Sequence, residues 1–175
     1  EALKTREKLV MFMQKVRGLN KVKKLRNSRW PQEKPLISII IPCFNYGQFV
    51  EEAIDSALNQ TFHNFEIIVV EGGSTDKTTV QKLKTLNKPK TVIYYREERH
   101  LVGDNRNNGI ERASGKYISC LDADDKLKPT YLEKGLFLAE SYNYDMVYPS
   151  VQLFDGRDEI WQAGKTNFLE CSRGN

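Results

Sequence analysis

LISIIIPCFN, residues 36–45, is the stretch of sequence that decides the fold. Its first six residues are apolar except Ser38, so both faces of a strand formed by them would be apolar, as in a buried strand of a parallel sheet. Short apolar runs further along the chain predict strands at residues 65–70, 92–95, 117–121 and 146–148. We expect the strands at 65–70 and 117–121 to be buried on both faces as well.

Amphipathic stretches between these strands predict helices. They cover residues 48–58, 76–86 and 103–113, and a further helix is expected at 130–141. This alternation of strands and helices predicts an α/β fold with an open, mostly parallel sheet and helices on both faces. In such sheets, ligands bind at the carboxyl ends of the strands.

The composition suits one soluble, globular domain. The chain has 175 residues, is 39% hydrophobic and lacks an uncharged apolar run of about 18 residues, which argues against disorder and against an ordinary membrane-spanning helix. Cys43, Cys120 and Cys171 are too scattered for a disulfide framework or a zinc site. Since the N-terminus also lacks the pattern of a secretory signal, we expect a cytoplasmic protein.

Positive charge is concentrated at the N-terminus. Residues 1–30 carry ten basic and two acidic side chains, a net charge of +8, whereas residues 31–175 have a net charge of −4. Apolar side chains at Leu9, Phe12 and Val16 follow a spacing of three and four, so residues 1–30 are predicted to form an amphipathic basic helix. It could bind an anionic membrane surface at the inner face, pack on a partner, or dock on its own domain. A linker is expected at residues 31–35.

Three carboxylates follow the predicted strand at residues 117–121. Asp122, Asp124 and Asp125 would repel one another unless a cation or hydrogen-bond donors offset their charge. An all-oxygen cluster suits Mg²⁺ or Mn²⁺, which commonly binds through one or two carboxylates and substrate phosphates. The alternative is an acidic turn that caps the following helix.

Other side chains are expected near the same edge of the sheet. Glu71 could accept hydrogen bonds from a ribose or a base, or be a solvated strand end. Phe44 could stack on a nucleobase or simply pack. Arg106 could contact a diphosphate or base oxygens, or be an ordinary surface charge. Residues 74–76 are expected to have a structural role, because they can cap the next helix.

Taken together, four ordered elements resemble the inverting glycosyltransferases of family 2, which have the GT-A fold. The elements are IIIPCFN at 39–45, NQT at 59–61 with FEIIVV at 65–70 and GSTD at 73–76, RNNG at 106–109, and DADD at 122–125. They are similar to the family's P-x-Y/F-N signature, its second segment, its R-N-x-G element and its D-x-D element. The resemblance covers about residues 36–154.

The resemblance implies a Rossmann-like domain that binds a nucleotide-sugar, often a UDP-sugar, for polysaccharide biosynthesis. By resemblance, Mn²⁺ or Mg²⁺ would bind at Asp124 and stabilise the charge of the leaving diphosphate. The implied nucleotide-binding residues are Pro42, Phe44 and Glu71 for the base side, Arg106 for the base or diphosphate, and Asp122 for the ribose.

The sequence departs from the family in two respects. Glu71 replaces the usual Asp, and Gly72 replaces a frequent second Asp. The family's catalytic base and acceptor segment lie well downstream of D-x-D, and residues 155–159 follow it too soon for that role. We therefore expect residues 36–175 to be the donor-binding portion of a longer enzyme, truncated before its catalytic base, with an unknown glycan, lipid or protein acceptor.

Other classes of function fit the sequence less well. A phosphatase with an aspartate nucleophile would place D-x-D early in the fold, and a nicotinamide-binding domain would have G-x-G-x-x-G in its first turn. A non-catalytic nucleotide-sugar-binding or membrane-docking module stays open, since the basic residues 1–30 support it. Nucleic-acid binding is not expected, because no recognised motif accompanies those residues. Cys43 has no nearby histidine in sequence and is expected to pack and not to react.

Overall fold

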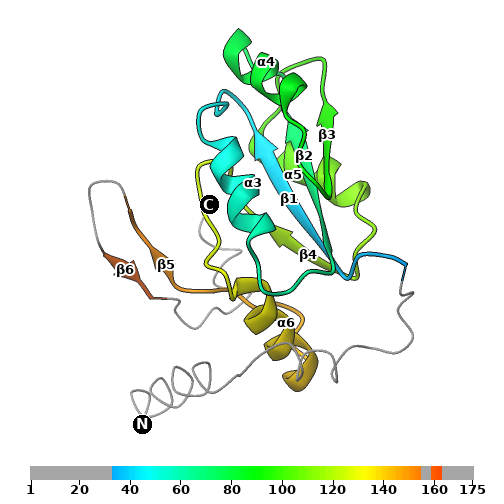
Figure 1. The fold of residues 1–175 in the computed structure, drawn as a ribbon, viewed down its shortest axis with the longest axis vertical. Helices are drawn as coiled ribbons and strands as arrows, with labels where there is room; N and C mark the ends of the chain where they lie inside the picture. Colours follow the sequence, from blue (N-terminus) through cyan, green and yellow to red (C-terminus); the bar gives the residue numbers. More distant parts are fainter. Residues whose placement is uncertain (1–32, 155–158, 163–175) are drawn as a thin grey trace, which may run out of the picture.

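The computed structural model describes residues 33–154 and 159–162 (Figure 1). The predicted basic helix of residues 1–30 lies outside the described residues, as do the first two positions of the linker. Within the described part, no helix is both long enough and apolar enough to cross a membrane.

Four strands form one parallel sheet. They are β1 (Ile37–Cys43), β2 (Phe65–Glu71), β3 (Thr91–Tyr95) and β4 (Tyr117–Cys120), in the order β3-β2-β1-β4. β1 pairs with β2 along its whole length and with β4 over its first four residues. Each strand begins and ends within two residues of a predicted one, so the predicted parallel α/β sheet is confirmed.

Helices cover both faces of the sheet, as predicted. They are α3 (Val50–Leu58), α4 (Lys77–Thr85), α5 (Val102–Glu111) and α6 (Tyr131–Tyr142). α3 and α4 pack on the face that carries Ile39 and Ile41 of β1. α5 packs on the opposite face, where a Cβ at Gly109 would lie only 2.5 Å from Cγ2 of Ile40. Figure 1 shows α3 in front of the sheet and α5 behind it.

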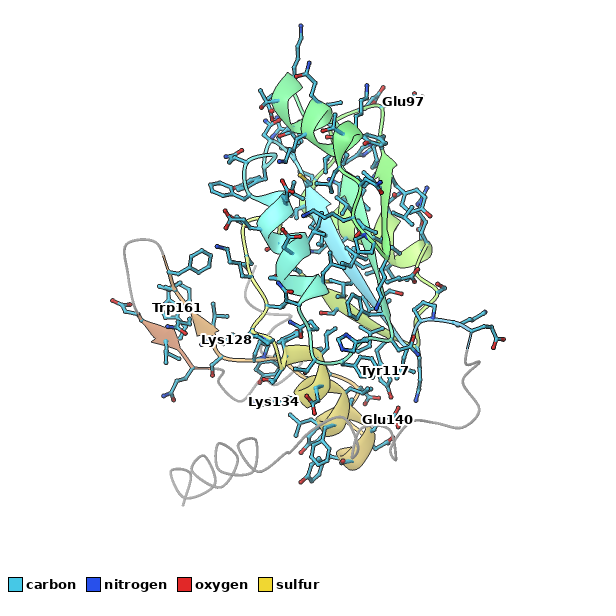
Figure 2. The ribbon with its side chains drawn as sticks, in the orientation of Figure 1. Glu97, Tyr117, Lys128, Lys134, Glu140 and Trp161 are labelled. Carbon is cyan, nitrogen blue, oxygen red and sulfur yellow. The ribbon has the colours of Figure 1, made fainter. Side chains whose placement is uncertain are left out.

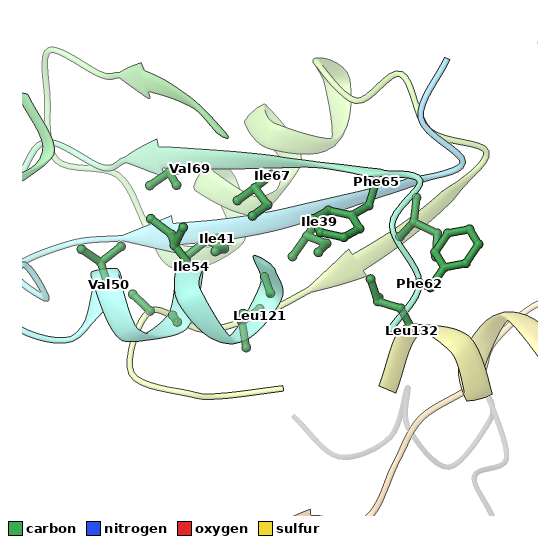
Figure 3. Packing of buried hydrophobic residues seen from close by; sticks show 14 of the residues in the cluster. Ile39, Ile41, Val50, Ile54, Phe62, Phe65, Ile67, Val69, Leu121 and Leu132 are labelled. Atoms are coloured by element: carbon green, nitrogen blue, oxygen red, sulfur yellow. The ribbon is translucent and has the colours of Figure 1, made fainter. Parts of the chain in front are cut away.

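The main hydrophobic core lies between the first face of the sheet and α3, and it continues to α6 (Figure 3). Val50 and Ile54 of α3 are fully buried against Ile41 of β1, and Leu132 of α6 lies beside Phe62. Full burial of one such side chain stabilises the fold by about 1.5–3 kcal/mol. This core therefore fixes α3 relative to the carboxyl end of β1.

Polar contacts connect α6 to the beginning of β4. The hydroxyl of Tyr117 donates to the carboxylate of Glu140, and Lys116 Nζ donates to the same oxygen at 2.7 Å. Figure 2 labels Tyr117 and Glu140 at this junction. α6 is thus held at the amino end of β4, away from the carboxyl edge.

Two sequence expectations are wrong. No strand forms at residues 146–148, where Met146 is 71% exposed and finds no strand to pair with; instead β5 (Val151–Gln152) pairs antiparallel with β6 (Ile160–Trp161). The sequence also predicts that β4 is buried on both faces, yet Ile118 is 42% exposed. The reason is that Ile118 lies on the same face as Ile40, and α5, which covers that face, packs mainly on β1 and β2 and not on β4.

The order of the strands reverses at β1. The chain runs from β1 outward to β2 and β3, and then crosses back through α5 to β4 on the other side of β1. Such a reversal separates the loops that leave the neighbouring strands and creates the position where ligands bind in open α/β sheets. The carboxyl ends of β1 and β4 meet there.

Candidate functional site at the carboxyl edge of the sheet

The side chain of Asn45 joins the loop after β1 to the turn after β2. Its Oδ1 accepts hydrogen bonds from the backbone N–H groups of Thr75 and Asp76 at 2.9 and 3.1 Å, and its backbone N–H donates to Ser74 Oγ at 2.9 Å. Asn45 has a φ of 59°, in the left-handed region that Asn adopts more readily than most residues. Asp76 accepts from the N–H of Thr79 at 2.6 Å and so caps α4. The predicted structural role of residues 74–76 is confirmed.

Glu71 is buried, with only 3% of its surface exposed. Its two carboxylate oxygens accept the backbone N–H groups of Gly73 at 3.3 Å and Ser74 at 2.6 Å. The interpretation as a solvated strand end is therefore wrong, because the carboxylate stabilises the turn after β2. A carboxylate oxygen can accept more than one hydrogen bond, so a contact with a nucleotide stays a prediction.

The loop between β3 and α5 packs closely on two glycines after β2. Gly73 has a φ of 76°, and a Cβ there would overlap the backbone of Glu98 and Arg99. A Cβ at Gly72 would overlap the side-chain amide of Asn105, which is 1% exposed. This packing explains why residue 72 is Gly at a position where the resemblance implies Asp.

Phe44 is half-buried at the end of β1. The guanidinium carbon of Arg99 lies 5.1 Å from the centroid of the Phe44 ring. One face of the ring is thus in contact with a cation from the β3–α5 loop. Stacking of Phe44 on a nucleobase stays a prediction.

Pro42 lies where the pairing of β1 with β4 ends. The carbonyl of Ile40 accepts from the N–H of Leu121 at 3.0 Å, and the next nitrogen of β1 on this side belongs to Pro42, which carries no hydrogen. On the other side, the carbonyl of Cys43 still accepts from the N–H of Gly72 at 2.8 Å. β1 therefore stays paired with β2 but separates from β4.

Arg106 of α5 and Asp122 after β4 form an ion pair between Nη2 and Oδ1. The two side chains stay 34% and 44% exposed. The buried Nε of Arg106 has no hydrogen-bond partner within the described residues. The fold thus brings together two of the predicted nucleotide-binding residues.

The acidic loop, residues 122–126, also carries Asp124 and Asp125. Both are exposed, and neither carboxylate has a hydrogen bond or an ion pair within the described part of the chain. Asp125 is exposed as a residue, but partial desolvation of its carboxyl raises its pKa above the ordinary value, and the carboxylates of Asp124 and Asp122 raise it further. The N-cap of α6 is Thr130, with no side-chain cap, so the alternative in which this cluster caps the following helix is wrong.

α3 and the segment that follows it anchor the chain directly after the acidic loop, a role that the sequence did not predict. The N–H of Leu127 donates to Ser56 Oγ at 3.0 Å. Gln60, 1% exposed, donates from Nε2 to the carbonyl of Lys128 at 2.9 Å and accepts at Oε1 from the N–H of Leu132 at 3.0 Å. The NQT element at residues 59–61 is a signal for this position. Its partners lie 68 and 72 residues away, so no local pattern identifies them.

The acidic loop suits a divalent ion that binds together with a diphosphate. No group of three or more His, Cys, Asp or Glu side chains in the described ranges is placed to hold a metal. Mg²⁺ and Mn²⁺ need only one or two protein carboxylates when substrate phosphates supply further ligands. The all-oxygen donors of Asp122 and Asp124 fit such an ion.

A pocket of about 330 Å³ opens beside Asp124. Its walls include Phe49 and Glu52 of α3, Asp125 of the acidic loop, and Phe154 after β5. Aromatic rings next to carboxylates suit a neutral group that has an apolar ring face and a rim of hydroxyls.

Cys43 is fully buried beside these loops. Burial raises the pKa of its thiol to about 12, which disfavours the reactive thiolate. The expectation that Cys43 packs is confirmed, and its raised pKa agrees with the prediction that it does not react.

Comparison of the sequence with known proteins gives a family and close relatives. The sequence model described as Glycosyl transferase family 2 matches residues 38–173. The uncharacterized glycosyltransferase RT0329 of Rickettsia typhi is 42% identical over 123 residues, which make up 69% of this chain and 38% of that protein.

Comparison with solved structures also finds similar proteins. TarS from S. aureus in complex with UDP has a TM-score of 0.62 at 25% identity, over 70% of this chain and 37% of the TarS chain. The mannosyltransferase PcManGT from Pyrobaculum calidifontis, in complex with GDP-Man and Mn²⁺, shares the fold with a TM-score of 0.51 at 21% identity, over 83% of this chain and 42% of its own. The chain spans less than half the length of each of these three proteins.

Proposed function

The chain belongs to glycosyltransferase family 2, and we propose that it forms the donor-binding part of an enzyme that transfers a sugar from a nucleoside diphosphate to an acceptor hydroxyl with inversion. UDP is the proposed nucleotide. The complex of TarS with UDP, at 25% identity, supports this choice.

The observation that carries the proposal is the ion pair of Arg106 with Asp122 at the carboxyl end of β4, followed two residues later by the unpaired carboxylate of Asp124. Phosphate recognition needs hydrogen-bond donors with positive charge, which a guanidinium supplies. The carboxylates supply ligands for a divalent ion that neutralises the same phosphates. A nucleoside diphosphate matches both kinds of group at once.

On this proposal the remaining residues of the edge orient the nucleoside. Glu71 is already fixed by its two hydrogen bonds to the turn, so its carboxylate presents a preorganised acceptor to the base. On this proposal the nucleotide binds at the edge where the pairing of β1 with β4 ends. The proposed nucleotide-binding residues are Pro42, Phe44, Glu71, Arg106 and Asp122.

Asp124 would hold Mn²⁺ or Mg²⁺, which would supply charge stabilisation to the departing diphosphate. The pocket beside Asp124 would take the sugar. Inversion requires the acceptor hydroxyl to attack from the side opposite the diphosphate and to lose its proton to a base. We assign no residue of the described part to that base.

Calorimetry of the chain with UDP and with GDP, each with and without Mn²⁺, tests the donor site. We expect UDP to bind more tightly than GDP and only with Mn²⁺. Asp124→Asn should weaken this binding at least about tenfold, which is about 1.4 kcal/mol. Asp145→Asn, which changes an exposed carboxylate in the segment after α6, is the matched control and should bind like the unchanged chain.

Each result has a definite meaning. If neither nucleotide binds in the presence of Mn²⁺, the donor site is wrong. If GDP binds more tightly, the proposed nucleotide is wrong. If Asp124→Asn binds as well as Asp145→Asn, Asp124 is not a metal ligand.

A further inference from the structure

Arg99 lies at the carboxyl edge of the sheet, and the site described above gives its side chain no role. We propose that Arg99 binds the diphosphate of the nucleotide, and that its contact with the Phe44 ring is the resting position of the side chain in the free protein. This inference rests on the proposed function and adds a residue that determines affinity for the diphosphate.

The backbone of Arg99 is firmly held at the carboxyl edge. The N–H of His100 donates to the carbonyl of Gly72 at 3.1 Å, and the N–H of Arg96 donates to the carbonyl of Glu71 at 3.0 Å. Between these two bonds the loop lies so close to Gly73 that a Cβ there would overlap it. The starting point of the Arg99 side chain is therefore fixed, and only the side chain itself is free to move.

The guanidinium of Arg99 differs from those of the other arginines in the described part of the chain. Arg96 donates to Asn105 Oδ1, Arg112 donates to the carbonyl of Asn108, and Arg106 pairs with Asp122. The guanidinium of Arg99 has no hydrogen-bond acceptor and no ion pair within residues 33–154 and 159–162. Its cation–π contact with the Phe44 ring is the one polar interaction that it makes there. Its five N–H donors are therefore available.

The charge of the edge favours a phosphate as the partner. The positive charge of Arg106 is offset by Asp122, and the carboxylates of Asp124 and Asp125 repel an anion. Arg99 adds a guanidinium that forms no ion pair within the described residues, although Glu97 and Glu98 precede it in the sequence. A guanidinium fits phosphate oxygens with two parallel hydrogen bonds, a stronger contact than an exposed cation–π pair, so moving from the ring to the phosphate is favourable.

The same movement would uncover Phe44. Because the guanidinium carbon lies 5.1 Å from the ring centroid, a base that stacks on this face of Phe44 takes the place of the guanidinium. Binding of the base and movement of Arg99 toward the diphosphate are thus compatible steps of one event.

Calorimetry of Arg99→Ala with UDP and with uridine, in the presence of Mn²⁺, tests the inference. We expect the affinity for UDP to fall about tenfold, about 1.4 kcal/mol, while the affinity for uridine stays the same or rises slightly because Phe44 is uncovered. Arg99→Lys should keep part of the UDP affinity, since it keeps the charge but loses the fork of donors. Added salt should weaken UDP binding less in Arg99→Ala than in the unchanged chain.

Arg112→Ala is the matched control, because the guanidinium carbon of Arg112 also lies over an aromatic ring, 4.9 Å from the centroid of Tyr94. It should leave UDP affinity unchanged. Equal UDP affinity in Arg99→Ala and the unchanged chain overturns the inference and leaves the proposed function standing. An equal loss for UDP and uridine, or an equal loss in Arg112→Ala, also overturns it. Failure of the unchanged chain to bind UDP overturns both proposals.

Discussion

Two loops at the same edge of the sheet differ in whether their polar side chains have hydrogen-bond partners in the fold. After β1 and β2, Asn45 and Glu71 accept backbone N–H groups of the turn, and Asp76 accepts one from the first turn of α4. After β4, Asp124 and Asp125 accept nothing from the described part of the chain, and their charges act on each other. A polar residue at a carboxyl edge is thus not a ligand by position alone. Asn45 and Asp76 build the turn through their hydrogen bonds, and Glu71 is fixed by its own but can still accept from a ligand. Asp124 and Asp125, which have none, are available to a ligand.

Among the substitutions that test this contrast between the two loops, those at Asn45 should have the largest effect on stability. Asn45→Ala should lower the free energy of unfolding by about 2–3 kcal/mol, because the N–H groups of Thr75 and Asp76 lose their acceptor and Ala is strained at a positive φ. Asn45→Gly keeps the backbone conformation and isolates the hydrogen-bond part of this loss. Urea denaturation measures both changes.

Asn87→Ala serves as the control, since Asn87 is exposed and has no side-chain hydrogen bond within the described ranges. It should change the free energy of unfolding by less than about 0.5 kcal/mol. If Asn45→Ala and Asn87→Ala lose the same free energy of unfolding, the hydrogen bonds of Asn45 do not stabilise the fold.

Glu66 is a further carboxylate with hydrogen bonds from the fold, and its contribution to stability should depend on pH. Burial alone would raise the pKa of Glu66, but hydrogen bonds from the hydroxyl of Ser38 and from the N–H and hydroxyl of Ser114 bring it below its ordinary value. A lowered pKa contributes stability above the pKa of the unfolded chain, about 4.3, and this stability is lost as the pH falls through the folded value.

Glu66→Gln should therefore lower the free energy of unfolding by about 1 kcal/mol at pH 7 and by much less near pH 3. Thermal or urea unfolding across this range gives the difference between the two proteins at each pH. Glu111→Gln, at an exposed position without a side-chain partner in the described part, should show no such pH dependence. A difference that stays constant down to pH 3 would refute the role of the ionised Glu66.

The smallest effect is expected at Asp125, where the sign is opposite. Because its pKa is raised in the folded protein, the folded state binds a proton more tightly than the unfolded chain, and stability falls as the pH rises through this range. Asp125→Asn should therefore stabilise the protein by about 0.5 kcal/mol at pH 7 and have no effect near pH 3.

Added salt should reduce the gain at pH 7, since it screens the repulsion between exposed carboxylates. Urea denaturation at low and high salt measures it. A destabilised Asp125→Asn would show that the carboxylate has a stabilising partner, contrary to the comparison.

The sequence predicts the parallel sheet well because its signals are local. A strand such as β1 is buried on both faces, and a helix such as α3 has a regular apolar stripe. The sequence pattern that identifies each of them is contained within about ten residues. The segment at residues 146–148 has a similar apolar pattern but no neighbouring strand. Since a strand requires a hydrogen-bonding partner, its composition alone misleads.

At the site, the sequence predicts which residues reach the edge but not what they contact there. Arg106 and Asp122 are predicted separately, and only the fold pairs them. Glu71 is expected either at a ligand or in solvent, whereas it binds the turn that follows it. Gln60 holds partners about seventy residues away. Such contacts depend on the path of the chain between elements, which no periodicity encodes.

Pro42 also determines the length of the span that carries the acidic residues. An N–H at this position could donate to the carbonyl of Leu121 and extend the ladder between β1 and β4 by one bond. With proline there, the last ladder bond is at Leu121, and the next backbone hydrogen bond to another element runs from the N–H of Leu127 to Ser56 Oγ of α3, so five residues lie between the two bonds. The reach of these five residues away from the sheet is therefore specified by an imino acid on a different strand.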